Sequence, residues 1–94
     1  MKKLKVPETE SELKKETEKM LKKLEQEIKH TKPTDRLDSK AIKEAMENVH
    51  AYISDCKHFQ QKNSLIHAFE AIVYAWGILD TLQRCHLIIK KTDI

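Results

Sequence analysis

Glycine and proline are scarce in this chain of 94 residues, which contains one glycine and two prolines. Barrels, sandwiches and nucleotide-binding α/β folds need many tight turns and glycine-rich loops, so this composition argues against them. Charged residues make up 35% of the chain and hydrophobic residues 39%, a balance that is typical of a small bundle with a solvated surface. We therefore expect an all-α fold.

Hydrophobic residues recur at steps of three and four over three segments, which predicts helices at about residues 9–30, 39–60 and 65–89. Short connections make consecutive helices antiparallel, so the expected architecture is an up-down-up three-helix bundle. Residues 1–8 are expected to form a frayed N-terminal tail, and residues 9–94 a single domain.

Polar residues at the expected helix ends support these boundaries. Thr9 and Glu12 have the spacing of a capping box at the start of the first helix. Asp38 or Ser39 is expected to cap the second helix. Asn63 tolerates the left-handed conformation that a tight turn between the second and third helices requires.

The basic excess of the chain is concentrated in its first third. Residues 1–32 contain ten lysines and seven glutamates, whereas the net charge of the whole chain is only +3. Lysines interleaved with glutamates at short spacing indicate a solvated helix face, because a nucleic-acid surface presents cations without acids between them. We therefore do not expect specific nucleic-acid binding, and any binding should be weak and lost in salt.

The sequence predicts a cytoplasmic protein. No apolar segment of signal-peptide type follows Met1, and the longest apolar run, Ala71 to Leu79, is too short to span a membrane. The thiols of Cys56 and Cys85 should therefore stay reduced, and both residues are expected in the hydrophobic core.

The second half of the chain resembles the archaeal domain-of-unknown-function family numbered 357. The resemblance covers about 30 residues and rests on the pattern Asp55, Phe59, Ala68, Tyr74, Ala75, Gly77, Leu79 and Asp80. In the turn, Asn63 stands where we expect a glycine in that family. The resemblance implies a three-helix bundle in an archaeal cytosol and supplies no activity.

Asp55 and Asp80 are the acids that could form a catalytic pair. The antiparallel register separates them by about 12 Å along the bundle axis, beyond the roughly 5 to 9.5 Å at which two carboxylates cooperate. We expect separate structural partners instead, with Arg84 as a candidate for Asp80. Tyr74 lies nearly level with Asp55, so a hydrogen bond between these side chains is the simplest expectation.

The histidines do not form a metal site by their spacing. His67 shares a helix face with Glu70, but the other helices offer no matching ligands, and neither a metal nor a cofactor is expected. Gly77 in a helix interior costs about 1 kcal/mol, which predicts close packing of another helix or the approach of a ligand. Trp76 is expected to anchor the core.

The leading hypothesis is a non-enzymatic interaction or structural module. The apolar surface of the third helix is wider than two helices can cover, so Ile66 and Ile78 are expected at a homodimer interface or against an unidentified protein partner. The alternative is a small-molecule or nucleic-acid-processing activity that uses four polar residues. These residues are Asp55, His67, Tyr74 and Asp80. Their convergence on one open pocket would favour the alternative.

Overall fold

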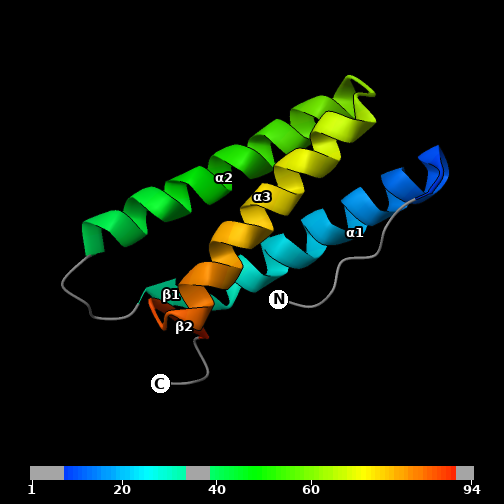
Figure 1. The fold of residues 1–94 in the computed structure, drawn as a ribbon. Coiled ribbons are helices and arrows are strands. Elements are labelled where there is room, and N and C mark those ends of the chain that lie inside the picture. The colour runs from blue at the N-terminus through cyan, green and yellow to red at the C-terminus, as the bar shows by residue number, and fades with distance from the viewer. Residues whose placement is uncertain (1–7, 34–38, 91–94) are drawn as a thin grey trace.

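The computed structural model describes residues 8–33 and 39–90, which form three helices and one pair of short strands (Figure 1). The elements in chain order are α1 (Glu10–Lys29), β1 (Thr31–Pro33), α2 (Ser39–Gln61), α3 (Leu65–Arg84) and β2 (Ile88–Lys90). The all-α class and the three-helix bundle expected from the sequence are confirmed. The expected tail, apart from Glu8, and the candidate cap Asp38 lie outside the described residues.

α3 is the central helix of the bundle, and α1 and α2 flank it (Figure 1). Ile72, Ala75 and Leu79 of α3 have no exposed surface, because α1 and α2 cover them from two sides. Leu24 of α1 and Val49 of α2 complete the same core and are also fully buried. α1 and α3 run in one direction and α2 in the other, which is the expected up-down-up order.

The start of α1 has the capping bond that the sequence predicts. The Thr9 hydroxyl accepts a hydrogen bond of 3.1 Å from the backbone N–H of Glu12. The Glu12 carboxylate reaches back to the N–H of Glu8 at 3.3 Å, one residue before the position that completes a standard capping box. Both bonds satisfy backbone donors that have no partner inside the helix.

The turn between α2 and α3 is a Schellman motif with Asn63 in the left-handed position. Asn63 has a φ of 57°, so the expected left-handed conformation is confirmed. Its N–H donates to the Gln60 carbonyl at 3.1 Å, and the N–H of Ser64 donates to the Phe59 carbonyl at 2.9 Å. These bonds satisfy the last carbonyls of α2 and reverse the chain within a few residues.

α3 ends with the same motif, five residues before its predicted end. His86 has a φ of 56°, and its N–H donates to the Gln83 carbonyl at 3.0 Å. The N–H of Leu87 donates to the Leu82 carbonyl at 2.9 Å. The prediction that the helix continues to Ile89 is therefore wrong, because the left-handed residue turns the chain away from the helix axis.

The chain beyond that turn forms β2, which pairs antiparallel with β1. Ile88 lies opposite Pro33, and Lys90 lies opposite Thr31. No strands were expected from the sequence, because Thr31 lies between the first two predicted helices and Ile88 lies near the predicted end of the third. The side chain of Ile88 is 2% exposed, so the strand pair closes one end of the hydrophobic core.

We predict that Ile88→Ala lowers the free energy of unfolding by about 2 to 5 kcal/mol, because it opens a cavity in a buried site. The matched control is Ile89→Ala on the same strand, whose side chain is only partly buried and should contribute less. Chemical denaturation of the two variants and the parent measures the difference. Equal losses for both variants would show that the strand pair is not part of the core.

Candidate functional site

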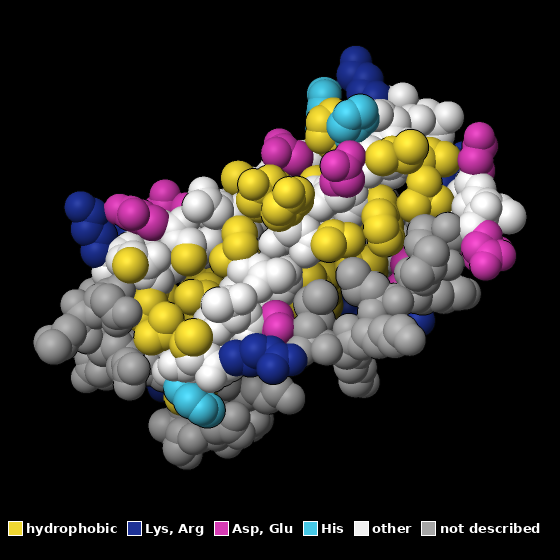
Figure 2. All heavy atoms as spheres, in the orientation of Figure 1, with side chains coloured by type: hydrophobic (Ala, Val, Ile, Leu, Met, Phe, Trp, Pro, Cys, Tyr) yellow, Lys and Arg dark blue, Asp and Glu magenta, His cyan; other side chains and the backbone are white. Residues whose placement is uncertain are grey.

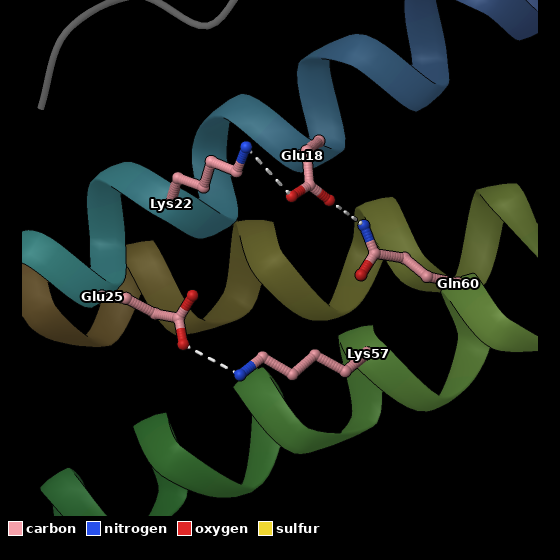
Figure 3. A network of polar contacts seen from close by, with 5 residues as sticks. All are labelled: Glu18, Lys22, Glu25, Lys57 and Gln60. Atoms are coloured by element: carbon pink, nitrogen blue, oxygen red, sulfur yellow. Dashed lines mark hydrogen bonds and ion pairs between the residues drawn. The ribbon is translucent and has the colours of Figure 1, made fainter.

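α1 and α2 meet along a polar seam (Figure 3). Lys57 Nζ of α2 lies 2.8 Å from Glu25 Oε2 of α1, and Gln60 Nε2 donates to Glu18 Oε2 at 2.9 Å. Lys22 lies 3.7 Å from the other oxygen of Glu18. The hydrogen bond from Lys57 to Glu25 raises the pKa of Lys57, and the nearby charge of Glu25 adds to the effect. These exposed pairs orient the two helices and contribute little to stability.

Cys56 lies in the core beside this seam and has no exposed surface. Burial, together with a smaller effect of the negative charge of Glu18, raises the pKa of its thiol from the ordinary 9.0 to about 11. The prediction that Cys56 belongs to the core is confirmed. The same prediction for Cys85 is wrong, because Cys85 follows the last residue of α3 and is exposed.

Trp76 joins α3 to α1 by packing and by one hydrogen bond. Its ring packs against the core and is partly buried. The indole Nε1–H donates to the backbone carbonyl of Met20, in the middle of α1, at 2.9 Å. Trp76 therefore anchors α1 to the central helix, which agrees with its expected role in the core.

Gly77 faces open space. A Cβ placed on Gly77 would meet no atom of another helix within 4 Å. The expected close packing of a helix against Gly77 is therefore wrong. Gly77 instead lines a shallow groove of about 580 Å³ between α2 and α3. The other lining residues are Ala45, Val73, Tyr74, Ile78, Thr81 and Leu82.

Tyr74 stands at the edge of this groove with 62% of its surface exposed. Its ring stacks on Tyr52 of α2, with ring centroids 5.5 Å apart and planes 17° apart. The expected hydrogen bond between Tyr74 and Asp55, both of which the structure describes, does not form. The side chain of Asp55 is exposed on α2. The register placed the two residues nearly level, but stacking on Tyr52 holds the ring at the surface.

The other two candidate residues also have local structural partners. Asp80 Oδ2 accepts a hydrogen bond of 2.9 Å from Arg84 Nε one turn along α3, as expected. His67 Nδ1 and the Ser64 hydroxyl share a hydrogen bond of 2.8 Å, so this hydroxyl does not cap α3. The His67 ring also lies 5.2 Å from the ring of Phe59.

The four polar candidates do not converge on one pocket. His67 and Asp80 belong to the same helix and are separated by thirteen residues, which is about 20 Å along its axis. Tyr74 lines the groove, whereas Asp55 projects from the exposed side of α2. In the part of the chain that the structure describes, no three His, Cys, Asp or Glu side chains lie close enough to hold a metal ion.

α3 is long and apolar enough, by length and composition, to cross a membrane. One third of that stretch, 33%, is buried inside the protein. The central helix of a soluble bundle has the same composition, because it must cover its neighbours on both sides. This property of α3 is therefore weak evidence for a membrane location.

We predict that Gly77→Ala raises the free energy of unfolding by up to about 1 kcal/mol. Alanine removes the entropic cost of glycine in a helix, and its Cβ points into open space. Chemical denaturation at low protein concentration measures the effect. The control is Ala75→Gly on the buried face, which should destabilise the fold. A loss of stability in Gly77→Ala would mean that the position is packed.

We predict that a maleimide at pH 8 labels Cys85 at least about a hundredfold faster than Cys56. Cys85 is exposed, whereas Cys56 is buried with a pKa of about 11. Because this pKa lies above the ordinary 9.0, the contribution of the neutral thiol to stability is complete below pH 9 and is lost as the pH rises through 11. Mass spectrometry of Cys85→Ser, native and in denaturant, isolates Cys56. Fast labelling of native Cys56 would contradict its burial.

Comparisons with known proteins agree with this fold. The model of the family "Protein of unknown function (DUF357)" matches residues 16–88. A crystal structure of protein AF1782 from Archaeoglobus fulgidus, assigned to the same family, is similar at a TM-score of 0.74 and 32% sequence identity. The match covers 86% of this chain and 96% of that one. No curated protein gives a significant match. The chain belongs to the DUF357 family.

Proposed function

We propose that this protein is a non-enzymatic interaction module that binds a protein through the outer face of α3. The outer face is the side of α3 that α1 and α2 leave partly uncovered, and it borders α2 along the groove. Its residues are Ile66, Glu70, Val73, Tyr74, Gly77, Thr81 and Arg84. The observation that carries the proposal is that, among residues 8–33 and 39–90, the exposed large hydrophobic side chains are Ile66 at 67% and Tyr74 at 62%, and both belong to this face.

The environment of the outer face supports a binding role. Hydrophobic side chains gather along α3 and the adjoining edge of α2, with charged side chains around them (Figure 2). The groove beside Gly77 adds an apolar depression. The polar side chains in its lining are those of Tyr74 and Thr81, and both are uncharged. The Thr81 hydroxyl donates to the Gly77 carbonyl at 2.8 Å, so it leaves no unsatisfied donor in the groove.

The separation of the four polar candidates argues against the alternative of a small-molecule or nucleic-acid-processing activity. General acid and base groups must reach one reacting centre within hydrogen-bond distance. About 20 Å of helix separates His67 from Asp80, and Asp80 is engaged with Arg84. The module is proposed to act in the cytoplasm, where the exposed thiol of Cys85 stays reduced.

Site-specific photo-cross-linking tests the proposal. A benzophenone amino acid replaces Thr81 on the outer face or, as the control, Lys43 on the exposed side of α2. After irradiation in native extract, we expect a discrete cross-linked product from position 81 and none from position 43. Gel electrophoresis and mass spectrometry identify the product. Equal products from both positions, or none from position 81, would contradict the proposal.

A further inference from the structure

Three residues mark a straight line along the outer face of α3. Glu70, Gly77 and Arg84 are spaced by seven residues, and seven residues turn an α-helix to within about 20° of its starting direction. The acidic side chain therefore lies at one end of the line, the basic side chain at the other, and the bare backbone of Gly77 in the middle. This arrangement has the symmetry of a surface that is complementary to itself.

We propose that a second copy of this chain covers the outer face, with the two α3 helices antiparallel and a two-fold axis passing beside Gly77. The proposal rests on the proposed function and names the partner of that surface. Around such an axis, Glu70 of one protomer lies level with Arg84 of the partner subunit, and the reverse pair forms on the other side. A parallel arrangement would instead place like charges opposite each other, so charge selects the antiparallel one.

Both charged groups are available for these pairs. Within the described ranges, Glu70 is exposed and has neither a hydrogen bond nor an ion pair. Arg84 is also exposed and uses its Nε–H for Asp80, which leaves the terminal N–H groups of its guanidinium for a second carboxylate. The bond to Asp80 holds Arg84 in place, so pairing with Glu70 orders fewer free side chains.

The centre of the line suits close contact between two helices. At Gly77 no side chain separates the backbones, and none of the described residues of the other helices lies within 4 Å of the place that a Cβ would take. Glycine destabilises a helix interior relative to alanine, and close approach of a second helix offsets that loss. Tyr74 lies one turn from Gly77, and its ring is held in place by stacking on Tyr52. The interface would therefore have a rigid aromatic group at its edge.

Charge reversal and mixing test this geometry. Glu70→Arg and Arg84→Glu each place like charges opposite each other twice in a homodimer. In a one-to-one mixture, the heterodimer of the two variants has opposite charges at both positions. Sedimentation equilibrium from about 1 to about 100 μM measures association of the parent, each variant and the mixture. Glu47→Arg, on the exposed side of α2, is the charge-matched control.

We expect the parent and Glu47→Arg to sediment at twice the 11.0 kDa chain mass. Each single charge reversal should weaken association at least about tenfold, and the mixture should return to within about threefold of the parent. Circular dichroism checks that each variant is folded. A parent that stays monomeric throughout the range, or a mixture that associates no better than the separate variants, overturns the proposal.

A disulfide trap gives an independent result if Arg84→Glu does not fold. On the two-fold axis, position 77 faces itself, so Gly77→Cys in a Cys85→Ser background should form a disulfide-linked dimer in oxidised glutathione. Glu47→Cys in the same background should associate like the parent but form no disulfide-linked dimer. Absence of the position 77 dimer overturns the antiparallel geometry.

These results are separable from those of the cross-linking experiment. A monomeric parent whose position 81 cross-links to a different protein in extract contradicts the second copy and leaves the interaction module standing. A monomeric parent without any cross-link contradicts both.

Discussion

The burial of one side of α3 is the constraint on which the rest of the structure depends. Ile72, Ala75 and Leu79 need cover from two helices, and α1 and α2 provide it with almost no direct packing on each other. The seam between α1 and α2 is therefore free to be polar. Trp76 fixes α1 to α3, and α3 keeps an open side because the described part of the chain contains no further helix to cover it.

The sequence predicted the three helices well but missed the end of α3 and the two strands, for a physical reason. Three-four periodicity reports which residues face the core, and it continues through Leu87 and Ile88 although the backbone leaves the helix at His86. Asn63 signalled its turn because asparagine favours left-handed geometry. Histidine is a less usual left-handed residue at a helix end than glycine or asparagine. A pair of three-residue strands depends on a contact between distant segments.

The candidate site shows a similar limit. The helical spacing of Ile66 and Ile78 predicted an uncovered apolar arc, and Ile66 is indeed exposed while Ile78 lines the groove. The cost of glycine in a helix predicted that something should approach Gly77 but not from which side. The seven-residue steps from Glu70 to Gly77 and from Gly77 to Arg84 are visible in the sequence. They indicate a binding surface only once the structure shows that this side of α3 is open at Gly77.

The strand pair has a consequence for the order of folding. β1 follows α1 and β2 follows α3, so their pairing joins two segments with the whole α2–α3 hairpin between them. The hairpin can form from contacts that are local in sequence, whereas the strand pair must close a long loop at an entropic cost. We expect the hairpin to fold first, and the strands to pair in a later step that joins the ends of α1 and α3.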